Sequence, residues 1–229
     1  VGQTTATGPS IILRPDDALV QGTTTTTASI TGTTGGLYEA LNTSATVATT
    51  VTDGTATPTT VTLSSATNGT AITEGGSITY TATVGTAVTG TPLVVTLSNG
   101  QTITIPVGQT TANSAPFAVR ADDVYTQGSV ALPAVTITGT AGANYEAVTT
   151  AGAVNNTVVD DADATVVNLA VSSAAVAEGA SVTYTVSVAN AVTGTPLAVT
   201  LNNGQTITIP VGQTTATGPA IILRPDDAL

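Results

Sequence analysis

Residues 77–84 read SITYTATV, and residues 181–188 read SVTYTVSV. In the first segment, apolar side chains from Ile78 to Val84 occupy every second position, and hydroxyl-bearing side chains occupy most of the positions between them. This period-two pattern is typical of a β-strand with one buried face and one solvated face. The chain is also rich in Thr, Val and Ile, whose branched side chains fit a pleated sheet better than a helix. The two segments therefore predict strands.

Further strand patterns recur along the rest of the chain, and no segment shows helical periodicity with caps. The further predicted strands are residues 59–64, 93–97, 101–105, 116–120, 134–138 and 145–159, the last one broken by a bend. Asn99-Gly100 and Asn203-Gly204 lie between such segments, and Asn-Gly is a strong hairpin signal. Seven or so short strands in about 105 residues predict an immunoglobulin-like β-sandwich.

The sequence repeats itself at a period of about 104–107 residues. Residues 87–112 and 191–216 differ at two of 26 positions, and the first 19 residues return with one change as the last 19. Such self-similarity indicates a repeat architecture, and a unit of this size can enclose its own core. We expect the C-terminal part of a repeat in residues 1–55, a complete repeat in 56–161 and the N-terminal part of a repeat in 162–229, within a longer array. The predicted fold is all-β, with tandem immunoglobulin-like sandwiches arranged as an elongated rod.

The composition excludes several classes of function. The net charge is −11 with only three Arg and no Lys, whereas nucleic-acid binding requires clustered cations. Without Cys and His, the chain has no thiolate chemistry, no soft-metal site and no imidazole base. No apolar run is long enough to span a membrane. We therefore expect neither an enzyme nor a membrane-spanning segment.

The acidic residues lie in a recurring pattern at the ends of the predicted strands, and the strands themselves are nearly uncharged. They are Asp16, Asp17, Glu39, Asp53, Glu74, Asp122, Asp123, Glu146, Asp160, Asp161, Asp163, Glu178, Asp226 and Asp227. Loops at strand ends cluster at the poles of a sandwich, so these carboxylates can converge. Oxygen ligands in flexible loops, without His or Cys, select Ca²⁺. The alternative is that these acids are solvated turn residues, as Asp-Asp pairs often are.

The three cations, Arg14, Arg120 and Arg224, each lie two residues before an Asp-Asp pair. They either orient a ligand carboxylate or form a local salt bridge, which is the simpler interpretation. The expected junctions between repeats also differ. The first holds a single Asp, Asp53, whereas the second reads Asp160-Asp161-Ala162-Asp163. If these acids bind Ca²⁺, the first junction should bind it more weakly or with fewer protein ligands.

Five segments in this order, TEGGSITYTATV, VTGTPLVVTLSNGQTITIPVG, PFAVRADDVY, GANYEAV and VVDDADAT, resemble the extender repeats of large LapA-like RTX biofilm adhesins of Gram-negative bacteria. The resemblance covers the whole chain. It implies secretion to the cell surface, anchoring at the outer membrane, and Ca²⁺ bound at and near the junctions between immunoglobulin-like extenders. The residues that it assigns to Ca²⁺ are Glu74, Asp122, Asp123, Glu146, Asp160, Asp161 and Asp163, with their counterparts in the partial repeats.

The leading hypothesis is a structural spacer of a cell-surface fibre, in which Ca²⁺ makes the junctions rigid and neighbouring repeats of the chain are the main partners. One alternative is a module that binds a ligand directly, although near-identical repeats suit a spacer better. Another is self-association of chains through edge strands into a matrix or filament.

Overall fold

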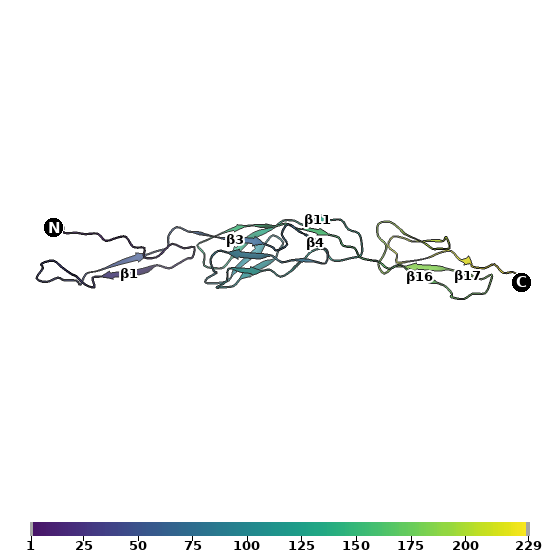
Figure 1. Cartoon of the computed structure of the whole chain (residues 1–229), viewed down its shortest axis with the longest axis horizontal. Helices are drawn as coiled ribbons and strands as arrows, with labels where there is room; N and C mark the ends of the chain where they lie inside the picture. Colours follow the sequence, from purple (N-terminus) through teal and green to yellow (C-terminus); the bar gives the residue numbers. More distant parts are fainter. Residues whose placement is uncertain (1, 228–229) are drawn as a thin grey trace. The chain divides into compact units, whose positions relative to one another are not determined.

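The regular secondary structure of the described residues consists of strands. The structure is a computed structural model that describes residues 2–227, and within that range it contains no helix (Figure 1). Accordingly, no helix of these residues has the length and apolar character needed to cross a membrane. The all-β prediction is confirmed. The described residues fall into two compact units: 2–71, 77–118 and 131–157 form the first, and 72–76, 119–130 and 158–227 form the second.

Two four-stranded sheets make up the centre of the first unit. Their strand orders are β13-β3-β6-β9 and β14-β12-β7-β8, and every pairing within them is antiparallel except β13 with β3, which is parallel. The strands are β3 (Pro58–Ser64), β6 (Thr81–Val84), β7 (Leu93–Leu97), β8 (Thr102–Ile105), β9 (Thr111–Asn113), β12 (Val135–Ala141), β13 (Ala147–Ala151) and β14 (Ala153–Val154). This arrangement is consistent with a β-sandwich.

Alternation of side chains places one face of each central strand in the core. In β3, every second residue is buried, among them Val61 and Leu63. In β8, Ile103 and Ile105 are fully buried and the Thr residues beside them are exposed. The core is thus formed by Val, Leu and Ile, while Thr covers the solvated face, as the period-two pattern predicts.

The predicted strand at 77–84 is divided into two strands in different sheets. β5 (Ser77–Ile78) pairs with β10 (Phe117–Ala118), whereas β6 pairs with β3 and β9. Between them, the backbone of Tyr80 bonds to Ser114: Tyr80 N donates to Ser114 Oγ (3.1 Å), and Ser114 N donates to Tyr80 O (2.8 Å). The prediction of one continuous strand is wrong, although the buried face continues across the break.

The predicted strand at 145–159 is broken, as expected. It forms β13, β14 and β15 (Thr157–Val159). Gly152 lies at the first break with a φ of +87°, and a Cβ there would lie 2.2 Å from the carbonyl oxygen of Leu63. Only glycine fits this position. A three-stranded sheet of order β11-β15-β4 joins β15 to β11 (Val130–Ala131) and β4 (Ala71–Thr73).

The remaining strands form smaller sheets. In the first unit, β1 (Thr24–Ser29) and β2 (Thr46–Val51) form an antiparallel pair in which no residue is buried. The sheets of the second unit have the orders β16-β18-β21, β17-β22 and β19-β20, and Val186, Val188, Ile207 and Ile209 form a core cluster there. These strands are β16 (Asn168–Val171), β17 (Ser181–Val182), β18 (Tyr184–Ser187), β19 (Leu197–Thr200), β20 (Thr206–Ile209), β21 (Thr215–Thr217) and β22 (Ile221–Ile222). The repeat boundaries expected after residues 55 and 161 stay a prediction.

Candidate metal site

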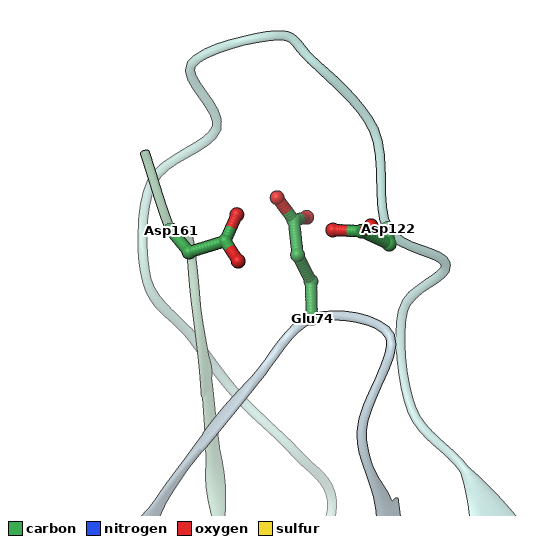
Figure 2. Close-up of side chains that lie close together, drawn as sticks. All are labelled: Glu74, Asp122 and Asp161. Atoms are coloured by element: carbon green, nitrogen blue, oxygen red, sulfur yellow. The ribbon is translucent and has the colours of Figure 1, made fainter. Parts of the chain in front are cut away.

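Three carboxylates from distant parts of the sequence converge at one point of the second unit. Glu74 follows β4, Asp122 lies in the loop after β10, and Asp161 follows β15. One carboxylate oxygen of each lies within 4.8 Å of the others. Figure 2 shows the three side chains directed toward one another from separate segments. We call these three residues the acidic cluster.

Backbone contacts between the three segments hold the acidic cluster together. Glu74 N donates to Val159 O (2.9 Å), and Gly75 N donates to Arg120 O (2.8 Å). Gly75 has a φ of +73°, and a Cβ there would lie 2.9 Å from Cβ of Asp122. Both the backbone conformation and the close approach of Asp122 therefore require glycine after Glu74.

Glu74 is the buried member of the acidic cluster. Its side chain is only 1 % exposed, and its Oε2 accepts a hydrogen bond from Arg120 Nε (2.7 Å). Its other oxygen, Oε1, is buried and has no hydrogen-bond partner among the described residues. Burial raises the pKa of Glu74, since a charged carboxylate loses hydration there. A buried acceptor without a partner is a costly arrangement that a bound cation would relieve.

A fourth carboxylate, Asp160, lies beside the same guanidinium. Arg120 Nη2 is 3.6 Å from Asp160 Oδ1, and the backbone N of Gln127 donates to Asp160 Oδ2 (2.7 Å). Arg120 is thus shared between Glu74 and Asp160. Together with Asp122 and Asp161, these groups carry four negative charges against one positive charge, which leaves a formal charge of −3. The electrostatic balance favours a cation.

The spacing of the acidic cluster fits one Ca²⁺. Ca²⁺ binds oxygen ligands at about 2.3–2.6 Å, so two ligands of the same ion are at most about 4.6–5.2 Å apart. The three carboxylate oxygens lie within 4.8 Å of one another, close enough to share one ion. Asp122 and Asp161 are exposed, which leaves room for water to complete a coordination shell of six to eight oxygens.

Asp123 is adjacent to Asp122 but is engaged elsewhere. Its Oδ1 accepts from Tyr125 N (2.8 Å), and its Oδ2 accepts from Gln127 Nε2. The Asp123 carboxylate therefore stabilises its own loop through hydrogen bonds and does not belong to the acidic cluster. Asp17 makes the same contacts in the leading part of the chain, with Leu19 N (2.8 Å) and Gln21 Nε2.

Three other acids of the first unit, Asp53, Glu146 and Asp16, accept hydrogen bonds from residues outside the acidic cluster. Asp53 accepts from Arg14 Nη2 (3.1 Å) and from Gln21 N (2.7 Å); at the equivalent position, Asp160 accepts from Gln127 N and forms an ion pair with Arg120. Thr57 binds the other two acids. Its N donates to Glu146 Oε2 (2.6 Å), and its Oγ1 donates to Asp16 Oδ2 (3.3 Å).

Gly54 occupies the sequence position that corresponds to Asp161 in the later junction. A Cβ at Gly54 would lie 2.8 Å from Asp16 Oδ1. The described residues form no group of three carboxylates at this junction.

The loop that carries Glu74 is repeated at Glu178. Glu178 pairs with Arg224, and Gly179 N donates to Arg224 O (2.9 Å). Gly179 has a φ of +72°, and a Cβ there would lie 3.0 Å from Cβ of Asp226. Glu178, Gly179 and Asp226 thus reproduce the positions of Glu74, Gly75 and Asp122.

The last three predicted site residues lie outside the acidic cluster. Glu39 and Asp163 are exposed, and Asp227 interacts with other residues of its surroundings. For these residues, a role in metal binding stays a prediction.

Sequence reasoning missed the residues that shape the loops. Gln21 and Gln127 each bond to two carboxylates, and Thr57 bonds to two others. A signal for the glutamines was present, since DDALVQG at 16–22 and DDVYTQG at 122–128 share a Gln at the same distance from the Asp-Asp pair. Thr57 offers no such signal in a chain so rich in Thr.

The chain was compared with known proteins. No curated protein matches it. A family model does: the LapA domain matches residues 57–162 and again residues 163–228, which together make up well over half of the chain. The LapA domain is adhesin-related and is not, in general, an enzyme family. The chain therefore belongs to the LapA domain family.

Proposed function

We propose that this chain is a structural spacer of a cell-surface adhesin and that the acidic cluster binds one Ca²⁺. Membership of the LapA domain family supports the adhesin role. The observation that carries the metal proposal is that Glu74, whose Oε1 is buried and has no hydrogen-bond partner among the described residues, converges with Asp122 and Asp161. A solvated turn would leave such a carboxylate exposed.

The ion acts on three segments at once. Without a cation, mutual repulsion of the carboxylates and burial of Glu74 both disfavour the close approach of these segments. Ca²⁺ at the acidic cluster reverses this balance and links the end of β4, the loop after β10 and the segment after β15 through their oxygens. Arg120 holds the Glu74 carboxylate in place through a hydrogen bond to Oε2, and Gln127 N donates to Asp160 Oδ2 beside the same guanidinium.

The loop that supplies Asp122 also contacts the sequence of the following repeat. Tyr125 Oη donates to the carbonyl oxygen of Ala191 (2.8 Å). Val124 and Tyr125 line a pocket together with Val192 and Leu197. One face of this loop is thus held by the ion, and another is docked on residues 188–197. Ca²⁺ that fixes the loop would stiffen this connection, and tandem immunoglobulin-like sandwiches joined in this way would form an extended rod outside the cell.

The experiment compares the chain with two variants that each lose one negative charge. Glu74→Gln removes the buried carboxylate, whereas Asp163→Asn, two residues after Asp161, is the matched control. Thermal unfolding is recorded in Ca²⁺ and in chelator. At a hundredfold excess over Kd, Ca²⁺ should stabilise by about 2.7 kcal/mol, which corresponds to about 10 °C for a domain of about 100 residues.

Small-angle scattering of the same samples should show a larger maximum dimension with Ca²⁺ than with chelator. Both responses should persist in Asp163→Asn and disappear in Glu74→Gln. Equal responses of Glu74→Gln and the unaltered chain would contradict the assignment of the ion to the acidic cluster. An unchanged dimension despite a Ca²⁺-dependent melting temperature would contradict the rod-stiffening role alone.

Lateral association of chains is a second candidate. It is favoured by β1 and β2, a two-stranded pair in which all residues but the last are exposed. Such a pair presents unpaired backbone groups on both edges. Analytical ultracentrifugation over a range of concentrations tests it, since association predicts a mass that rises with concentration and a spacer predicts a constant mass.

A further inference from the structure

Only one peptide bond of the chain can be cut by a protease that cleaves after Lys or Arg. The sequence has three Arg and no Lys. Arg14 and Arg224 each precede a proline, whereas Arg120 precedes Ala121. A proline after the cleaved position blocks such proteases, because its ring locks φ and the chain cannot adopt the conformation that the protease cleft requires. The Arg120–Ala121 bond is therefore the single candidate for this cleavage.

The folded structure keeps this bond out of reach of a protease. A trypsin-like serine protease draws the Arg side chain into a pocket that ends in a carboxylate, and it needs the Arg carbonyl oxygen free for its oxyanion hole. Arg120 offers neither group. Its side chain is only 22 % exposed, and it donates from Nε to Glu74 Oε2 (2.7 Å) and from Nη1 to the carbonyl oxygen of Gly128 (3.1 Å). Its own carbonyl oxygen accepts from Gly75 N (2.8 Å).

The contacts that protect Arg120 come from the residues that form the acidic cluster and from their neighbours. Glu74 binds the guanidinium, Gly75 follows Glu74, and Asp122 lies two residues after Arg120. A cation that holds Glu74, Asp122 and Asp161 together therefore also holds Arg120 in its protected position. Without a cation, four carboxylates around one guanidinium repel one another and favour separation of the segments that carry them. Arg120 is thus released when the acidic cluster opens.

We propose that the Arg120–Ala121 bond is a cation-gated cleavage site for Arg-specific serine proteases. This inference rests on the proposed binding of Ca²⁺ to the acidic cluster: the ion keeps the bond protected, and its loss exposes the bond. Water then hydrolyses the peptide bond, which leaves a carboxylate on Arg120 and an amine on Ala121. Strands β3, β6 and β7 precede the bond and β12 and β13 follow it, yet these strands pair within the same two sheets. A cut would therefore leave these sheets joined by strand pairing alone, so that a fall in Ca²⁺ would turn a covalent link of the adhesin into a separable one.

The test exposes the 229-residue chain to trypsin in Ca²⁺ and in chelator, and mass spectrometry of the products gives the rate of cleavage after Arg120. If the ion binds only the closed form, about a hundredfold excess of Ca²⁺ over Kd should lower the open fraction, and with it the cleavage rate, by about a hundredfold. In Glu74→Gln, cleavage should be fast in both solutions. A synthetic peptide of residues 115–126 should be cut at the same rate in both, which shows that the protease itself is unaffected.

Ala121→Pro is the matched control variant, since Pro15 and Pro225 occupy the equivalent positions. It should bind Ca²⁺ as the unaltered chain does and resist trypsin in both solutions.

Calorimetric titration of the same samples with Ca²⁺ separates this inference from the proposed function. Absence of Ca²⁺ binding would overturn both, whereas Ca²⁺ binding with equal cleavage rates in Ca²⁺ and in chelator would overturn the gating alone. A peptide that trypsin does not cut would also overturn it. So would a rate in chelator that rises steeply at low urea concentrations, because that dependence indicates global unfolding rather than local opening of the acidic cluster.

Discussion

Replacing Gly75 by Ala should weaken Ca²⁺ binding, although Gly75 provides no ligand atom. Its φ of +73° costs a residue with a Cβ about 1–2 kcal/mol. The added Cβ would also lie 2.9 Å from Cβ of Asp122, where ordinary contact begins at 3.4 Å. Asp122 must therefore move by about 0.5 Å, which exceeds the roughly 0.2 Å that a metal site tolerates. We expect Kd for Ca²⁺ to rise at least about tenfold, as when groups that position metal ligands are altered.

Gly69→Ala is the matched control for this substitution. Gly69 has a φ of +77°, and nothing lies within 4 Å of the position of its added Cβ. It therefore incurs the same backbone cost without displacing a ligand. Urea unfolding in chelator should show a similar loss of stability for both variants, and calorimetric titration with Ca²⁺ should separate them. Unaltered Ca²⁺ affinity in Gly75→Ala, or an equal loss in Gly69→Ala, would refute the argument that Gly75 positions Asp122.

Three further predictions concern the pH, the ligand set and the docked loop. Burial raises the pKa of Glu74 above its ordinary 4.5, so the folded state binds this proton more tightly than the unfolded chain does. In chelator, the charged Glu74 therefore lowers the stability of the fold at neutral pH, and this loss of stability should fade as the pH falls toward 4.5. The midpoints of urea unfolding should show this trend, and Glu74→Gln should abolish the pH dependence. Asp161→Asn should weaken Ca²⁺ binding in calorimetry, whereas Asp163→Asn should not, and equal effects would contradict the ligand assignment. Tyr125→Phe should cost about 1 kcal/mol by removing the hydrogen bond to Ala191 while Kd for Ca²⁺ stays unchanged; an altered Kd would show that the hydroxyl acts on the ion site.

The fold was predictable from the sequence where the residues that specify a strand or turn lie within that strand or turn. The alternation in residues 59–64 and 101–105 appears as β3 and β8. The Asn99-Gly100 turn joins β7 and β8 in the expected antiparallel pair. The division of residues 77–84 was not predictable, because it depends on Ser114, more than thirty residues away along the chain.

The type of site was predictable from the sequence, but the residues that form it were not. Recurring acids at strand ends indicated where carboxylates would gather, and Glu74, Asp122 and Asp161 do so. The sequence could not separate Asp122 from its neighbour Asp123, because the choice depends on the turn in which Tyr125 N and Gln127 bind Asp123. Nor could it show that Glu74 alone is buried, since burial follows from the packing of three distant segments.

The central claim is that one Ca²⁺ lies between Glu74, Asp122 and Asp161, and anomalous X-ray diffraction from crystals grown with Ca²⁺ tests it most directly. We predict an anomalous peak about 2.3–2.6 Å from one oxygen of each of the three carboxylates. A peak at this position that is absent in crystals of Glu74→Gln would complete the assignment. Fully occupied Ca²⁺ peaks elsewhere on the chain, with none between these three side chains, would contradict it.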